Sequence, residues 1–221
     1  MGIRLCIFDL DGVICNTAKY HYLAWKELAD DLHIPFNMQD NERLKGVSRM
    51  ASLDIILSLG NQENIPKEEK LAMAERKNTR YVEMISKMER NEILPGVESF
   101  LKELRKQGIK IALGSASKNT SIIMDRLNLR EAFDYIVDGT MIVNTKPDPE
   151  VFIKSMEYYG LEPEECLVFE DAAAGVEAAH RGGMRCVGIG NKVDLPEADY
   201  LIQGFAGVSF RTILEALGEA E

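Results

Sequence analysis

A short apolar run near the start of the chain ends in two aspartates that are two positions apart. Residues 5 to 8 are all apolar, and Asp9 and Asp11 follow them, with Gly12 next. An uninterrupted run of this kind is typical of a parallel strand that is buried on both faces. Burying an unpaired carboxylate is costly, so we expect a cation, most simply a metal ion, beside the aspartates. Because ligands bind outside the carboxyl ends of the strands in open α/β sheets, this motif predicts a functional site.

The composition narrows the class of protein. A chain of 221 residues with 46% apolar residues and no apolar segment of about 18 residues fits a soluble globular α/β protein with room for an inserted subdomain. The net charge of −10 argues against nucleic acid or an anionic membrane as a partner. The first strand begins almost at once, which leaves no room for a signal peptide, so we expect a cytoplasmic protein. Its four cysteines show no CxxC spacing and are expected to be reduced, chiefly as core residues.

The rest of the chain has the periodicity of an interrupted parallel α/β sheet. Helical spacing of apolar residues predicts three consecutive helices, at 17–32, 48–59 and 66–88. Alternation resumes after residue 96, with strands expected at 109–113, 135–137, 166–169, 185–189 and 200–202, and helices at 97–107, 119–127, 149–159, 173–181 and 210–217. We therefore predict an α/β fold with a Rossmann-like parallel sheet core, residues 1–14 and 91–221, and an inserted α-helical cap, residues 15–90. An insertion directly after the first strand would lie above the carboxyl ends of the sheet and act as a lid.

Polar residues also follow two of the later predicted strands. Ser115 comes after strand 109–113, and Glu170 and Asp171 end strand 166–169, while Lys146 and Pro147 precede a predicted helix. Because the carboxyl ends of parallel strands meet at one edge of a sheet, we expect these side chains to lie together. Carboxylate oxygens without histidine or cysteine partners favour Mg²⁺. The alternative is that these are solvent-facing strand ends and helix caps.

The order of these motifs, DxDG, then Ser, then Lys-Pro, then Glu-Asp, resembles that of the haloacid dehalogenase-like superfamily of phosphotransferases. The resemblance implies that Asp9 is a nucleophile that forms an aspartyl-phosphate and that Asp11 is the general acid and base. It implies that Ser115 and Lys146 contact the transferring phosphoryl group. It also implies a Mg²⁺ site formed by four carboxylates, those of Asp9, Asp11, Glu170 and Asp171.

Segments of both the predicted cap and the predicted core extend the resemblance to the sugar-phosphate mutases of that superfamily. The matching residues lie in 17–25, 44–49, 77–78 and 115–119, although Cys15-Asn16 stands where many relatives carry Thr-Asp. The resemblance implies substrate contacts from Thr17, His21, Lys45, Gly46, Val47, Arg49, Lys77, Ser115, Ala116, Ser117, Lys118 and Asn119. Arg49, with residues 117–119, would hold the phosphate that is not transferred, and a guanidinium offers a bidentate fork for that purpose.

The implied reaction is the interconversion of β-D-glucose 1-phosphate and D-glucose 6-phosphate through an aspartyl-phosphate and β-glucose 1,6-bisphosphate. We expect a phosphorylated hexose as the partner, Mg²⁺ as the cofactor, and a monomer. A Mg²⁺-dependent sugar-phosphate phosphatase would use the same residues with water as acceptor. A non-enzymatic phosphosugar-binding protein is the third possibility, which the intact acidic motifs disfavour.

Single cap residues also have simpler interpretations. Lys45 and Arg49 fit a solvated pair of like charges on a helix, which repel each other mildly. His21 fits a histidine that only packs, and Lys77 fits an exposed position on a charged helix. Trp25 is expected in the core of the cap.

Overall fold

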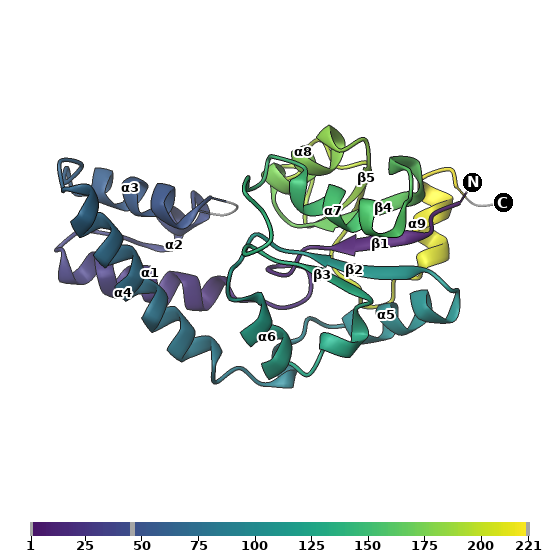
Figure 1. Cartoon of the computed structure of the whole chain (residues 1–221), viewed down its shortest axis with the longest axis horizontal. Helices are drawn as coiled ribbons and strands as arrows, with labels where there is room; N and C mark the ends of the chain where they lie inside the picture. Colours follow the sequence, from purple (N-terminus) through teal and green to yellow (C-terminus); the bar gives the residue numbers. More distant parts are fainter. Residues whose placement is uncertain (1, 45–46, 220–221) are drawn as a thin grey trace. The chain divides into compact units, whose positions relative to one another are not determined.

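The computed structural model describes residues 2–44 and 47–219 (Figure 1). Its contacts divide the chain into two compact units, residues 1–16 with 89–221 and residues 17–88. We call them the core unit and the helical unit. The sequence pattern places these boundaries after residues 14 and 90. In the described part of the chain, no helix is both long and apolar enough to span a membrane.

The core unit is built on a parallel sheet of six strands in the order β3-β2-β1-β4-β5-β6, which confirms the predicted fold class. The strands are β1 (Leu5–Phe8), β2 (Lys110–Gly114), β3 (Tyr135–Val137), β4 (Cys166–Glu170), β5 (Arg185–Ile189) and β6 (Tyr200–Ile202). The first strand therefore lies in the middle of the sheet. Its last residue, Phe8, is level with Leu113 of β2 and Phe169 of β4. This register brings the carboxyl ends of three strands to the same edge.

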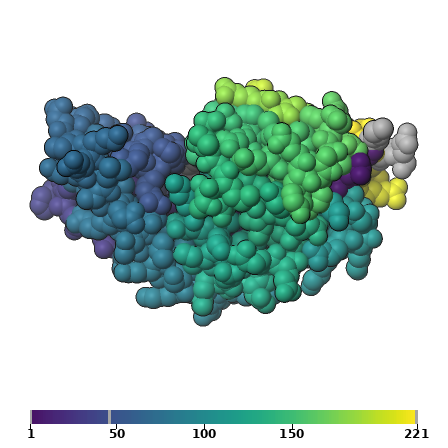
Figure 2. Space-filling view, viewed as in Figure 1, coloured from purple at the N-terminus to yellow at the C-terminus, as the bar shows by residue number. Residues whose placement is uncertain are grey.

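Helices cover both faces of this sheet. Figure 1 shows α7 (Glu150–Tyr159) and α8 (Ala173–Arg181) on one face, and α5 (Val97–Lys106) and α6 (Thr120–Arg126) on the other; α9 (Phe210–Ala216) packs against α5. Short 3₁₀ helices lie at Arg90–Glu92, Arg130–Ala132 and Pro163–Glu165. On the face of the core unit that Figure 2 shows, teal and green segments cover most of the surface, and the purple N-terminal segment appears only as a small patch at one end. The central strands β1 and β4 are buried along their whole length, and all four cysteines are free and buried.

Alternate side chains of β1 enter two different apolar layers, as the pleat of a strand requires. Leu5 and Ile7 join the cluster beneath α7 and α8. Phe8 points to the other face, where its ring stacks on Phe169 with centroids 4.5 Å apart and meets Phe100 edge-on at 6.3 Å. Apolar packing on both faces therefore holds β1, which the acidic motif follows, in place in the sheet.

The helical unit consists of α1 (Ala18–Asp31), α2 (Met38–Glu42), α3 (Arg49–Leu59) and α4 (Lys67–Ile85). Helix α4 packs against α1 and α3. Trp25 is 2% exposed and belongs to the apolar cluster of this unit, as predicted.

Helix α2 was not predicted from the sequence. It begins with a capping box, in which the Asn37 side chain accepts from the backbone N–H groups of Gln39 and Asp40, and the Asp40 carboxylate accepts from the backbone N–H of Asn37. A helix of five residues is too short to show hydrophobic periodicity. The sequence feature that indicates it is the spacing of Asn37 and Asp40, which is that of a capping box.

The aromatic layer under the motif gives a test of the fold. Phe8→Ala should lower the free energy of unfolding by about 3–5 kcal/mol, since it leaves a cavity among packed rings. Phe8→Leu should cost less because it keeps most of the apolar surface. Urea denaturation followed by circular dichroism measures both. Val193→Ala, at a position 89% exposed, serves as the control, and an equal loss there would contradict this account.

Candidate active site

The ammonium group of Lys146 connects the ends of three strands. Its Nζ donates to Asp9 Oδ1 at 2.5 Å, to Glu170 Oε1 at 2.8 Å and to the carbonyl oxygen of Gly114 at 3.2 Å. Lys146 is 7% exposed, and its Nζ lies 4.7 Å from the ring centroid of Phe152. An ammonium has three N–H donors, and these three contacts use all of them. The buried charge is therefore paired and fully hydrogen-bonded, as burial requires.

The loop that carries Lys146 is held from the start of α7. The Glu150 carboxylate accepts from the backbone N–H of Val143 at 3.0 Å and from that of Asn144 at 2.8 Å. Lys146 and Pro147 precede α7, which begins at Glu150. Glu150 thus fixes the segment from which the lysine reaches the sheet.

Burial and charge shift the pKa values of this pair. Burial raises the pKa of Asp9 to about 6, although the Lys146 ammonium acts in the opposite direction. For Lys146, burial alone would favour the neutral amine, but the carboxylates of Asp9 and Glu170 raise its pKa above the ordinary value. Lys146 is therefore charged at neutral pH. A further cation beside Asp9 would favour its carboxylate form.

Three of the predicted carboxylates gather at this edge of the sheet. Asp9, Glu170 and Asp171 each offer an oxygen, and these atoms lie within 4.8 Å of one another. At Mg–O distances of 2.0–2.1 Å, opposite ligands of the ion are about 4.2 Å apart, so oxygens within 4.8 Å of one another have about the spacing that a shared Mg²⁺ requires. The side chain of Asp11 is not part of this group, and its backbone N–H donates to the Asp9 carboxylate.

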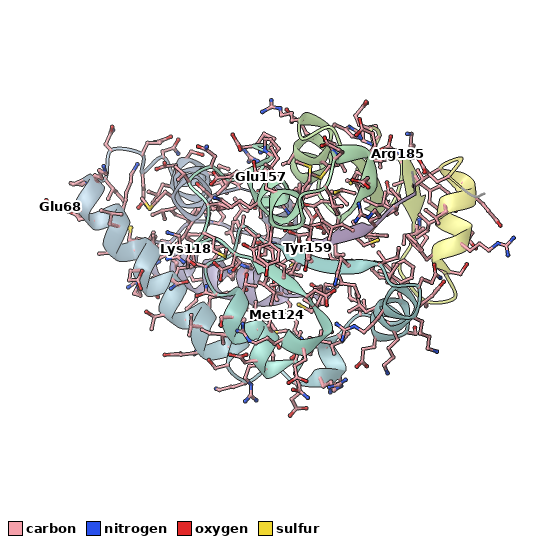
Figure 3. All side chains as sticks on the ribbon, turned by 45° about the vertical axis from the view of Figure 1, so that its right-hand side comes forward. Glu68, Lys118, Met124, Glu157, Tyr159 and Arg185 are labelled. Atoms are coloured by element: carbon pink, nitrogen blue, oxygen red, sulfur yellow. The ribbon has the colours of Figure 1, made fainter. Side chains whose placement is uncertain are left out.

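The segment after β2 winds through two hydroxyl-capped turns. Ser115 is 2% exposed, and its N–H donates to a carbonyl of β3. Its Oγ accepts from the N–H of Ser117 at 3.1 Å, and Ser117 Oγ accepts from the N–H of Asn119 at 3.2 Å. Ala116 is half-buried, while Lys118, labelled in Figure 3, is exposed. The turns place this polar segment directly after the strand next to β1.

A second buried lysine lies inside the helical unit. Lys77 is 4% exposed, so the interpretation of it as a surface residue is wrong. Its Nζ lies 2.9 Å from His21 Nδ1, and 4.5 and 4.9 Å from the ring centroids of Trp25 and Tyr81. Burial, together with the charges of Lys77 and Arg49, lowers the pKa of His21 well below its usual value. His21 is therefore neutral and presents Nδ1 as an acceptor to the ammonium.

Arg49 begins α3 and is held by α4. Its Nη2 donates to Asn78 Oδ1 at 2.8 Å, and its Nη1 lies 3.5 Å from Glu75 Oε2. These contacts involve two of the five N–H donors of a guanidinium. Glu75 is thus a charged neighbour of Arg49, while the pairing with Lys45 considered from the sequence lies outside the described residues.

Of the remaining predicted contact residues, two have described backbone contacts within the helical unit and two lie outside the described residues. The backbone carbonyl of Thr17, which is buried at the start of α1, accepts from the N–H groups of Tyr20 and His21. Val47 is half-buried, and its N–H donates to a backbone carbonyl three residues earlier. Lys45 and Gly46 lie outside the described residues.

Sequence reasoning missed three residues that shape the core site, namely Gly114, Glu150 and Gly175. The carbonyl of Gly114 carries no side-chain signal. Glu150 acts through a loop whose course depends on the tertiary structure. Gly175, on α8, borders Glu170, and its only signal was a glycine within a predicted helix, where glycine is a poor helix former.

Comparisons with known proteins agree with this arrangement. A family model described as haloacid dehalogenase-like hydrolase matches residues 3–183. The chain is 39% identical over 214 residues to a β-phosphoglucomutase of Bacillus subtilis (strain 168), covering 96% of this chain and 95% of that protein. A crystal structure of β-phosphoglucomutase from Clostridium difficile has a TM-score of 0.92 and 43% identity, covering 98% of each chain. A phosphorylated carbohydrates phosphatase of Thermotoga maritima is 29% identical over 180 residues, 80% of this chain and 81% of that one.

The family match begins just before β1, includes the helical unit and ends two residues after α8. It therefore includes the acidic residues, the serine segment and the buried lysine of the core site. The chain belongs to the haloacid dehalogenase-like hydrolase family.

Proposed function

We propose that this protein is a phosphomutase that interconverts β-D-glucose 1-phosphate and D-glucose 6-phosphate. The observation that carries the proposal is the similarity, at 39% and 43% identity over nearly the whole chain, to proteins named β-phosphoglucomutase. The similarity includes the helical unit, which is proposed below to recognise the part of the substrate that is not transferred. The Asp9–Lys146–Glu170 group supports the same chemistry.

Asp9 is the nucleophile in this proposal. A carboxylate oxygen of Asp9 attacks phosphorus, the bond from phosphorus to the sugar oxygen breaks, and Asp11 gives a proton to that oxygen. Phosphorylated Asp9 transfers its phosphoryl group to the free hydroxyl of a sugar monophosphate by the reverse of these steps; Asp11 takes up the proton, and the 1,6-bisphosphate forms. Because a phosphate repels a carboxylate, the Lys146 ammonium, 2.5 Å from Asp9 Oδ1, offsets the charge as the two meet. Ser115 is proposed to hydrogen-bond the phosphoryl group.

The acidic group is proposed to hold Mg²⁺ through Asp9, Glu170 and Asp171, with Asp11 beside them. Bound there, the ion would supply positive charge to phosphoryl oxygens during transfer. The oxygen-only donor set supports Mg²⁺ over a softer metal.

The helical unit is proposed to recognise the rest of the substrate. Arg49, with Ser117, Lys118 and Asn119, would bind the phosphate that is not transferred, and residues 45–47 would contact the sugar. The neutral His21 and the buried Lys77 would add polar contacts. Binding energy from this second phosphate would be used to exclude water from phosphorylated Asp9.

A sugar-phosphate phosphatase is the alternative, supported by the similarity to the Thermotoga maritima phosphatase. Product analysis separates the two. Incubation with β-glucose 1-phosphate, a trace of the bisphosphate and Mg²⁺ yields glucose 6-phosphate if the protein is a mutase, and inorganic phosphate if it is a phosphatase.

Asp9→Asn should abolish mutase turnover while leaving the fold intact, since the amide keeps the shape of the nucleophile but not its charge. A coupled assay for glucose 6-phosphate measures turnover, and circular dichroism checks folding. Asp125→Asn, which changes an exposed acid on α6, is the matched control. Appreciable turnover by Asp9→Asn would exclude the aspartyl-phosphate route.

Removal of divalent ions should abolish activity, and Mg²⁺ should restore it, because the site offers only carboxylate ligands. The measurement is the initial rate after treatment with EDTA, followed by titration of Mg²⁺ or Zn²⁺ into the treated enzyme. Full activity in excess EDTA, or restoration by Zn²⁺ alone, would contradict the proposed metal.

Arg49→Ala should lower kcat/KM for β-glucose 1-phosphate roughly 30- to 150-fold, the loss of about 2–3 kcal/mol from one charge-assisted contact. Phosphorylation of Asp9 by acetyl phosphate should continue, since that donor has no second phosphate. Arg76→Ala, at an exposed arginine of the helical unit, is the control. If Arg49→Ala turned over the substrate normally, Arg49 would not bind the second phosphate and the phosphatase alternative would gain support.

A further inference from the structure

Gly175 of α8 faces the carboxylate of Glu170. A Cβ at this position would lie 1.7 Å from Glu170 Oε1, 2.1 Å from Cδ and 2.4 Å from Cγ. Glu170 is 1% exposed, so its side chain has little room to move away. The backbone of Gly175 is helical and requires no glycine, and glycine is among the poorest helix formers. The space that it leaves therefore explains its presence.

The Glu170 carboxylate that occupies this space is held at both oxygens. Oε1 accepts from Lys146 Nζ at 2.8 Å. Oε2 accepts from the backbone N–H groups of Asp171 at 2.6 Å and Ala172 at 3.1 Å. Displacement of the carboxylate by a methyl group would therefore break contacts that orient Lys146 and the turn carrying Asp171.

We propose that Gly175 is a positioning residue for phosphoryl transfer. Its missing side chain lets the Glu170 carboxylate lie against Lys146, and this contact sets where the ammonium meets Asp9. The role of Lys146 in that transfer rests on the proposed function. Gly175 itself would touch neither the substrate nor the metal.

Gly12 has a similar relation to Asp171, because a Cβ there would lie 2.1 Å from Asp171 Oδ2. However, Gly12 has a φ of +79°, a conformation that other residues rarely adopt. A substitution at Gly12 would thus mix backbone strain with steric overlap. Gly175 gives the cleaner test.

The experiment compares Gly175→Ala, Glu170→Asp and the double variant. Two measurements need no sugar, namely the dissociation constant of Mg²⁺ by calorimetry and the rate of Asp9 phosphorylation by acetyl phosphate. Gly175→Ala should weaken Mg²⁺ binding at least tenfold and slow phosphorylation at least a hundredfold. In the double variant the shorter aspartate leaves room for the methyl group, so at least a tenfold recovery over Gly175→Ala is expected.

Gly182→Ala is the matched control. Gly182 directly follows α8, and a Cβ there would have its nearest neighbours at 3.3 Å, a tight contact that involves no carboxylate of the core site, so wild-type Mg²⁺ binding and phosphorylation are expected.

The proposal is overturned if Gly175→Ala binds Mg²⁺ and is phosphorylated like the wild type. It is also overturned if the losses of the two single variants multiply in the double variant, because a steric conflict with Glu170 requires them to compensate. If Gly175→Ala does not fold, recovery of a cooperative thermal transition in the double variant supports the proposal, and failure to recover it counts against it. Absence of mutase activity in the wild type would refute the proposed function and leave these two readouts unaffected.

Discussion

The core site depends on one buried ammonium shared between carboxylates of two strands. Without Lys146, the negative charges of Asp9 and Glu170 would face each other away from water, and the two groups would not both ionise at neutral pH. When Lys146 is present, its ammonium is paired with both carboxylates, and the carbonyl of Gly114 accepts from its third N–H. The same contacts tie β1, β2 and β4 together at the edge where the chemistry is proposed.

The sheet makes this sharing possible through its strand order. Because β1 lies between β2 and β4 and runs parallel to both, the residues that follow Phe8, Leu113 and Phe169 reach the same level. The aromatic rings beneath them hold β1 and β4 in register, since Phe8 and Phe169 stack directly. The packing of the aromatic rings below the sheet edge thus determines how far apart the charged side chains at that edge lie.

Much of this arrangement could be predicted from the sequence because it depends on periodicity and on polar residues at strand ends. Features that depend on tertiary neighbours could not. Lys77 lies on a charged helix, and its burial follows from the rings of Trp25 and Tyr81, which come from α1 and from the next turn of α4. The need for glycine at position 175 follows from where the Glu170 carboxylate lies. Helix α2 was missed for a local reason, because a five-residue helix is marked by its cap and not by a repeat.

The charges also explain why an acidic chain would need a divalent ion to receive a phosphorylated substrate. The net charge of −10 repels anions. At the core site, three carboxylates outweigh the single positive charge of Lys146 by two units when all are ionised. One divalent cation balances that excess, and it would also favour ionised Asp9, whose pKa burial raises to about 6.

The second phosphate of a bisphosphate would need a cation of its own, which is the role proposed for Arg49. The low pKa of His21 has a related cause, because an imidazolium beside the buried Lys77 and near Arg49 would add a third positive charge to one cluster.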